Sequence, residues 1–324
     1  MTNVYYSKLL DDKFLSQLKI ELSKYFKGCK KIAIKMHFGE ALNKTAFTPK
    51  DVKPLTDVLE SLGIQYYLYD SSVTYGGPRA NPTTHKMLAF SKGFKNVELG
   101  DEFIEVKGKY MNYEVCTKLV DVDAVLVLTH VKGHVCSGFG GAIKNLGMGA
   151  LTKETKNKIH RSGEPVFDGK CIKCGICVKC CPINGLKLEA GSSYPIIKQC
   201  YGCSNCAYSC PHGVIKTKVA PFDILLADGA NCAQSKFKKY YYISAIKNIT
   251  KECDCMPIPG KIISEDIGFV MSKDGVAIDQ ASYDLVVKTS GETFLENNKK
   301  RGTEQIIAAE KLGMGKRKYV LKKL

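Results

Sequence analysis

The sequence lacks any long apolar stretch. No run in its 324 residues approaches the ~20 apolar residues that span a bilayer. Residues 1–13 carry charges and tyrosines where a secretory signal has an unbroken apolar core. Low-complexity tracts of the kind that favour disorder are missing too. These absences argue against a membrane span and a secretory signal, so we expect a folded, cytoplasmic protein.

Acidic residues and histidines are also few. The chain has 32 Asp and Glu against 48 Lys and Arg, a formal charge of +16, and six histidines. A basic surface favours acidic or anionic partners, such as a redox protein, a small anionic ligand or nucleic acid, although solvated lysines are the plainer explanation. No known nucleic-acid-binding motif is present, so we do not expect nucleic-acid binding.

Cysteine, in contrast, is abundant. An odd count of 15 in a reducing compartment indicates metal ligation with a few free thiols rather than a disulfide framework. Most of these cysteines fall between residues 167 and 218, where glycines and prolines interrupt any helical or strand period. We therefore expect a separate module at residues 166–218.

Two cysteine runs in this module share one spacing. Each reads C-x2-C-x2-C-x3-C-P, and the second begins 29 residues after the first. Three cysteines spaced in this way wrap one cluster, and in two-cluster ferredoxins the last cysteine of each run ligates the other cluster. We predict two [4Fe–4S] clusters, one held by Cys171, Cys174, Cys177 and Cys210 and the other by Cys200, Cys203, Cys206 and Cys181.

Two alternatives concern these ligands. Paired C-x2-C sequences also build zinc ribbons, but a zinc ribbon uses two close cysteines per knuckle rather than a triplet, so the spacing favours iron–sulfur. Cys180 could replace Cys181 as a ligand, but only outside the register that the two runs share. Two clusters, each carrying roughly −2, would lower the net charge to about +12, so the protein stays basic.

On either side of the module, strand-like and helix-like segments alternate, which is typical of an α/β fold with a mostly parallel sheet. We expect one α/β domain, residues 1–165 and 219–324, interrupted by the module; two separate flanking domains are the alternative. The expected strands cover residues 31–36, 65–69, 124–128, 222–227 and 240–246. The expected helices cover residues 49–62, 83–91, 276–285 and 303–312.

A segment rich in glycine and histidine follows the apolar run 124–128. Ligands of open α/β sheets bind beyond the carboxyl ends of the strands, so a site is expected here. The glycines permit close approach, and a helix beginning nearby would offer free N–H groups to an anion. A plain glycine-rich turn is the alternative. The candidates are His134, Lys144 and His160 as catalytic residues, and Gly140, Gly141, Lys144 and Asn145 as ligands of an anion or cofactor.

Weaker candidates lie elsewhere. The segments 35–40 and 70–79 follow two other expected strands and are either site residues or turn residues. Cys253 and Cys255 are too few for a closed metal site, so we expect buried free thiols rather than metal ligands or a thiol pair.

At these residues the chain resembles the iron–sulfur proteins that carry the domain of unknown function numbered 362. That family is defined by sequence and by a ferredoxin insertion, so the resemblance implies no particular reaction. It covers most of the chain and rests on the segments 37–40 and 138–149, the double cysteine run, and Asp70, Thr74, Tyr75, Arg79 and Asp279.

A looser similarity links the glycine-rich loop to the lactate racemase family, whose Gly-Gly-x-x-Lys loop has one histidine ten residues before the lysine and another sixteen after it. His134, Lys144 and His160 have that spacing. In that family the lysine tethers a nickel-pincer nucleotide, the later histidine binds nickel and the earlier one is an acid/base. The similarity implies a shared fold and site location. Asp70 and Ser71 stand where the family has a further histidine, which argues against the nickel cofactor and racemisation.

The residues together predict an iron–sulfur oxidoreductase. Its clusters would relay single electrons to or from a ligand site around His134, Lys144 and His160. The alternative is a ferredoxin-like adaptor without a reaction of its own, whose α/β part docks a redox partner through basic residues.

Overall fold

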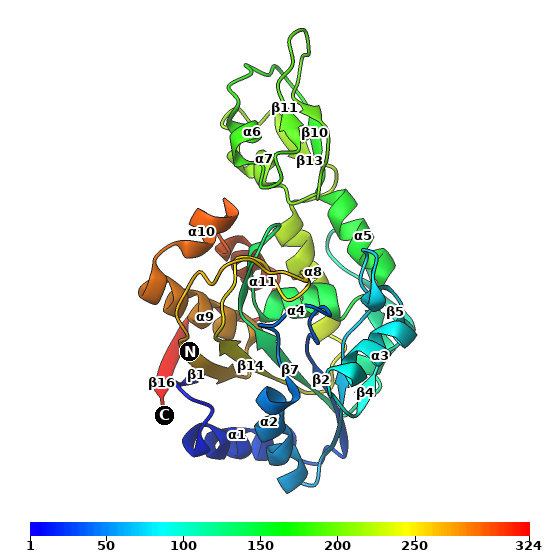
Figure 1. Cartoon of the computed structure of the whole chain (residues 1–324), viewed down its shortest axis with the longest axis vertical. Helices are drawn as coiled ribbons and strands as arrows, with labels where there is room; N and C mark the ends of the chain where they lie inside the picture. The colour runs from blue at the N-terminus through cyan, green and yellow to red at the C-terminus, as the bar shows by residue number, and fades with distance from the viewer.

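The computed structural model describes all 324 residues and contains one central sheet with helices on both faces (Figure 1). Only β15 runs against its two neighbours, and every other adjacent pair is parallel, so the predicted α/β class with a mostly parallel sheet is confirmed. In order across the sheet, the strands are β16 (Tyr319–Lys323), β1 (Thr2–Ser7), β15 (Gly268–Ser272), β14 (Tyr240–Ile246), β7 (Ala124–His130), β2 (Lys31–Lys35), β3 (Gln65–Tyr69) and β4 (Val97–Glu98).

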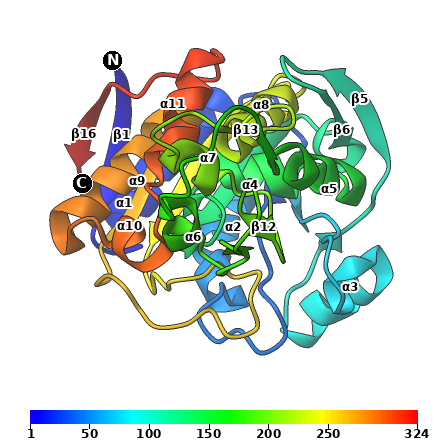
Figure 2. The same cartoon turned by 90° about the horizontal axis from the view of Figure 1, so that it is seen from above.

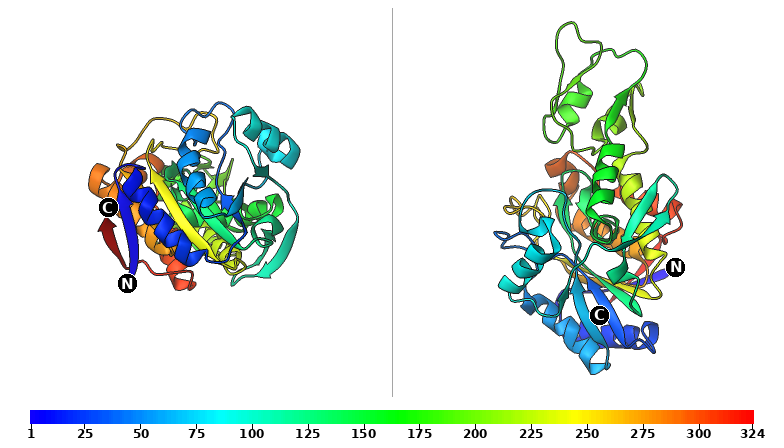
Figure 3. Two further views of the ribbon diagram at one scale, coloured as in Figure 1. Left: turned by 90° about the horizontal axis from the view of Figure 1, so that it is seen from below. Right: turned by 90° about the vertical axis from the view of Figure 1, so that its right-hand side faces the viewer.

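Each face of the sheet has its own apolar core. In β7, Val125 and Val127 pack into one core while Leu126 and Leu128 pack into the other, which explains the continuous apolar run. Figure 3 shows α1 and α2 in front of the sheet when it is seen from below, and the later helices lie behind it. One face is covered by α1 (Asp12–Tyr25), α2 (Pro49–Ser61) and α3 (Pro82–Ser91), and the other by α4 (Ala142–Gly149), α5 (Lys153–Ser162), α8 (Phe222–Gln234), α9 (Gly275–Ser290), α10 (Thr293–Asn298) and α11 (Thr303–Lys311).

One expected strand is wrong. Residues 222–227 begin the helix α8, in which all but two residues are buried. A helix that is buried all round has no polar face, so its apolar run cannot be told from a buried strand by periodicity. The other expected strands and helices are confirmed as β2, β3, β7, β14, α2, α3, α9 and α11. None of the helices combines the length and apolarity needed to cross a bilayer.

The cysteine-rich module projects from the top of the molecule (Figure 1) and, seen from above, covers the middle of the α/β part (Figure 2). Strands β10 (Pro165–Phe167) and β13 (Ile215–Thr217) pair antiparallel, so the chain enters and leaves the module side by side. Strands from before and after the module share the central sheet. We propose the module boundaries at residues 166 and 218. The module also contains α6 (Ile176–Cys180), α7 (Asn205–Ser209), β11 (Leu186–Lys187) and β12 (Ile196–Ile197).

Further short strands lie in the α/β part. They are β5 (Phe103–Lys107) paired with β6 (Asn112–Cys116), and β8 (Lys132–His134) paired with β9 (Gly138–Gly140). The second pair follows β7 directly and leads through Gly141 into α4, so it shapes the glycine-rich loop.

The start of α4 is capped from a distant helix. The buried carboxylate of Asp279 in α9 accepts the amide hydrogens of Ala142 at 2.6 Å and Ile143 at 2.9 Å. A Cβ at Gly141 would lie 2.3 Å from an Asp279 oxygen, so only glycine admits this cap. The expectation that these amides are free for an anion is therefore wrong, because the Asp279 side chain already accepts both hydrogens.

We expect Asp279→Ala to lower the free energy of unfolding by about 1–3 kcal/mol, because two buried helix-terminal amides lose their acceptor. Urea denaturation followed by circular dichroism measures this change. Asp284→Ala is the matched control, since Asp284 is an exposed residue of the same helix. Equal destabilisation by the two variants would contradict the capping role.

Candidate functional site

Two cavities in the module are each lined by four of the predicted cluster ligands. One is lined by Cys171, Cys174, Cys177 and Cys210 and the other by Cys181, Cys200, Cys203 and Cys206, so each run contributes its last cysteine to the other cavity. Cys180 lines neither cavity, and its thiol donates to the Cys177 carbonyl at 3.4 Å.

The two cysteine loops repeat the same backbone conformation. The third and fifth residues of each loop are left-handed, with φ of +57° at Lys173 and +77° at Gly175, and +63° at Gly202 and +60° at Ser204. In both loops the third residue donates its amide to the first cysteine's sulfur, at 3.4 Å and 3.2 Å. Four sulfurs in an apolar wall with amide donors to sulfur fit a [4Fe–4S] cluster.

The second loop lies directly against α5. A Cβ at Gly202 would lie 1.8 Å from the His160 carbonyl oxygen, so the two backbones are in closest contact there. Ser204 Oγ donates to the Gly163 carbonyl at 2.8 Å and accepts from the Phe222 amide at 2.9 Å. These contacts join the second cavity to the α/β part.

We expect Gly202→Ala to loosen this junction. A left-handed residue other than glycine costs about 1–3 kcal/mol by itself, and the loss of unfolding free energy in Gly202→Ala should exceed that cost because the new Cβ also clashes with α5. Gly191→Ala is the control, because Gly191 has φ +80° but no atom within 4 Å of the added Cβ. Thermal unfolding and limited proteolysis of the module measure the difference. If the two variants behave alike, the close contact with α5 does not hold the module against the α/β part.

A cavity of about 490 Å³ lies where the carboxyl ends of β2, β3 and β7 meet the module. Its wall brings together the predicted residues His134, Lys144, Asn145 and His160, and it also includes the cluster-cavity residue Cys200. Gly140 and Gly141 are not part of this wall. Further wall residues that the sequence did not single out are Lys156, Tyr201 and Met256.

A buried ion-pair network forms the floor of this cavity. Asp70 follows β3 and receives Lys35 Nζ at 3.1 Å and Arg79 Nη2 at 2.9 Å, and Arg79 also contacts Glu40 at 3.1 Å. Burial alone would raise the pKa of Asp70, but Lys35 and Arg79 hold it below its usual range. The segments 35–40 and 70–79 are thus both part of the site region.

Asn145 ties this network to the sheet. Its side-chain oxygen accepts from Lys35 Nζ at 2.8 Å, and its amide donates to the Leu128 carbonyl at 3.0 Å and to Thr129 Oγ1 at 3.1 Å. Its amide group is therefore already engaged by the protein, and the role of Asn145 as a ligand of an anion stays a prediction.

Lys144 differs from the other cations of the cavity. Lys35, Arg79 and Lys156 all donate hydrogen bonds within the protein, whereas Lys144 has neither a hydrogen bond nor an ion pair. Burial lowers the pKa of Lys144 to about 8. An unpaired ammonium group in a cavity wall is a binding group for an anion.

The two predicted histidines have opposite tautomers. His134 Nδ1 accepts the amide hydrogens of Cys136 at 3.3 Å and Ser137 at 3.1 Å, so in the neutral ring Nε2 carries the proton. His160 Nδ1 lies 2.7 Å from the Tyr201 carbonyl oxygen, so Nδ1 carries the proton and Nε2 has the lone pair. Burial lowers the pKa of both rings, and Lys144 lowers it further. Nε2 of His134 can thus donate a hydrogen bond, and Nε2 of His160 can accept a proton or a hydrogen bond.

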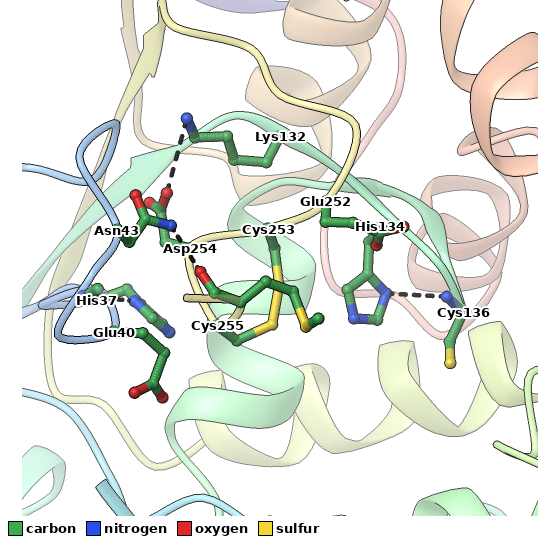
Figure 4. Close-up of a disulfide and its surroundings, with 12 residues drawn as sticks. His37, Glu40, Asn43, Lys132, His134, Cys136, Glu252, Cys253, Asp254 and Cys255 are labelled. Atoms are coloured by element: carbon green, nitrogen blue, oxygen red, sulfur yellow. Dashed lines mark hydrogen bonds and ion pairs between the residues drawn. A yellow bond between two sulfur atoms is a disulfide. The ribbon is translucent and has the colours of Figure 1, made fainter. Parts of the chain in front are cut away.

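Cys253 and Cys255 form a disulfide (Figure 4), so the expectation of free thiols is wrong. Cys255 lines the cavity, and both sulfurs and a His134 ring nitrogen lie within 4.8 Å of one another. His130, the last residue of β7, does not line the cavity and instead contacts Asp254 at 2.8 Å.

The sequence matches the family described as Domain of unknown function (DUF362) over residues 32–284. The chain belongs to this family. The match includes the ends of β2, β3 and β7 and both cysteine runs, so the cavity and the module of this DUF362 protein both lie within it.

One relative is a redox-enzyme subunit. The DUF362 chain is 40% identical over 52 residues to the NADH-dependent phenylglyoxylate dehydrogenase subunit delta of Aromatoleum evansii, covering 16% of this chain and 56% of that protein. The match therefore spans little more than half the length of the relative.

Two solved structures are similar at low levels. A Thermotoga maritima protein has a TM-score of 0.44 and 12% identity, over 94% of this chain and 60% of that one. The lactate racemase apoprotein from Thermoanaerobacterium thermosaccharolyticum has a TM-score of 0.36 and 10% identity, over 76% and 51%. Both scores are too low to support an argument, so nickel chemistry in this DUF362 protein gains no support from them.

Proposed function

We propose that this protein is an iron–sulfur oxidoreductase that moves single electrons between a protein partner and an anionic ligand in the cavity beside His134, Lys144 and His160. The observation that carries the proposal is the position of Cys200. This residue lines both the second cluster cavity and the large cavity at the sheet edge. A cluster held there would lie next to the bound ligand.

The two cluster cavities suit a relay with a defined direction. The first cavity includes the exposed Cys174 and is lined by residues of the module alone. The second is lined by residues that contact the α/β part. Clusters on these eight cysteines supply single electrons, so we assign the first cavity to exchange with a partner and the second to exchange with the ligand.

Lys144 and the two histidines define what the ligand site does. Lys144 supplies an unpaired cation, which favours a carboxylate or phosphate group on the ligand. His134 offers a proton at Nε2 and His160 offers a lone pair at Nε2. Reduction of an organic ligand changes the charge on its oxygen atoms, and this pair can stabilise that change, because His134 donates a hydrogen bond and His160 accepts a proton or a hydrogen bond.

A redox protein partner is supported by the surface around Cys174. Ile172 is 58% exposed and Ile176 is 39% exposed, and both line the first cavity. Lys170, Lys173 and Lys179 add positive charge nearby. A small apolar patch with a basic rim fits an acidic electron carrier. One relative is named as a subunit of a dehydrogenase, which supports the proposal that this protein also has a protein partner.

The enzyme and adaptor alternatives differ in what the cavity holds. We would purify the wild-type and Lys144→Ala proteins without oxygen and identify the extracted small molecules by mass spectrometry. An enzyme predicts an anionic compound that is present in the wild type and absent from the variant, with equal iron in both. Identical extracts from both proteins would favour the adaptor.

A further inference from the structure

The Cys253–Cys255 disulfide is a poor candidate for a structural cross-link. It joins residues only two positions apart, and a cross-link that closes so short a loop restrains the unfolded chain very little. Its location is more informative, because Cys255 lies in the same cavity wall as Cys200, Lys144 and His134.

Other contacts already hold the loop that carries the disulfide. Between the two cysteines, the buried Asp254 carboxylate contacts His130 at 2.8 Å. It also contacts Lys132 at 3.6 Å (Figure 4). The Asp254 carbonyl accepts the Glu40 amide at 3.1 Å, and Asn43 Nδ2 donates to the Met256 carbonyl at 3.0 Å. The loop can therefore keep its position when the sulfur–sulfur bond opens.

His134 provides a hydrogen-bond donor beside the sulfurs. Its Nδ1 accepts two backbone amides, so the neutral ring carries its proton on Nε2. If a metal were bound at Nε2, the ring proton would have to move to Nδ1. Nδ1 already accepts two amide hydrogens, so this tautomer is disfavoured. The cluster of His134, Cys253 and Cys255 thus favours sulfur redox chemistry over metal binding.

We propose that Cys253 and Cys255 are a redox-active pair that converts single electrons from the clusters into a two-electron store beside the ligand. This inference rests on the proposed function, because the clusters are the reductant. Two one-electron-reduced [4Fe–4S] centres each give one electron and return to the oxidised state. The sulfur–sulfur bond breaks, two protons are taken up, and two thiols form. Both protons enter from solvent through the cavity, and the His134 Nε2–H stabilises the nascent thiolate by donating a hydrogen bond to it.

The test is an anaerobic reductive titration of the iron-loaded protein with titanium(III) citrate. Portions are quenched in acid, alkylated and analysed by mass spectrometry of the peptide that contains both cysteines. We expect about four electrons per chain, two for the clusters and two for the disulfide, with alkylated Cys253 and Cys255. The Cys253→Ser/Cys255→Ser variant should take up about two electrons with an unchanged cluster EPR signal.

A control separates reduction through the clusters from direct reduction. In Cys181→Ser, which removes a ligand of the second cavity, the disulfide should be reduced at least about tenfold more slowly. Equal rates, a disulfide that persists while both clusters are reduced, or a metal bound by Cys253 and Cys255 would each overturn the inference. Absence of iron from the wild type would instead contradict the proposed function.

Discussion

Replacing Cys181 with serine should lower the iron content from about eight to about four atoms per chain, because one cluster loses a ligand while the other keeps all four. Cys181 is buried and lines the second cavity, where the Gly185 amide donates to its sulfur at 3.2 Å. Electron transfer into the ligand cavity should be lost with that cluster. Iron and sulfide analysis together with EPR of the reduced protein measure the result.

Cys180 provides a matched control one residue away. Its sulfur faces the Cys177 carbonyl and lines neither cluster cavity. Cys180→Ser should therefore keep about eight iron atoms per chain and the full EPR signal. Loss of a cluster in Cys180→Ser, with a normal count in Cys181→Ser, would contradict the assignment of ligands and favour the alternative register of the first run.

Replacing Lys144 with alanine should weaken binding of the anionic ligand by at least about 2 kcal/mol, or about thirtyfold in Kd, because truncation leaves a buried anion without its cation. Isothermal titration of the iron-loaded protein with the compound that co-purifies measures this loss. Lys153→Ala is the control, since Lys153 is an exposed residue at the start of α5. Similar losses in the two variants would mean that net charge, rather than Lys144, sets the affinity.

The same contact predicts a pH dependence. Burial lowers the pKa of Lys144 to about 8, so its ammonium is charged below pH 8 and neutral above it. Affinity should be constant up to about pH 7 and then fall towards about tenfold per unit above pH 8. In Lys144→Arg this fall should vanish, because arginine stays charged. A fall of equal size in that variant would assign the titration to another group.

Local patterns in the sequence predicted much of the site. Strand ends can be recognised in sequence, and parallel strands place their carboxyl ends at one edge, so His134, Lys144 and His160 were expected together. The spacing within the two cysteine runs is that of two-cluster ferredoxins, and it predicts the two sets of four cysteines that line the cavities.

The rest depended on contacts between distant parts of the chain. The cap of α4 comes from Asp279, 137 residues away, and no local pattern distinguishes this use of a glycine-rich loop from anion binding. Cys253 and Cys255 come next to His134 only because a loop after β14 folds back over the end of β7. Helix α8 resembles a strand in the sequence because burial on all sides removes the helical period of its apolar residues.

We propose above that this chain holds two [4Fe–4S] clusters beside a ligand cavity. The most direct test is metal and sulfide analysis of protein purified without oxygen, with EPR of the reduced sample. We expect about eight iron and about eight sulfide per chain and the signal of reduced [4Fe–4S] clusters. Zinc in place of iron, or cysteines that bind no metal, would contradict it.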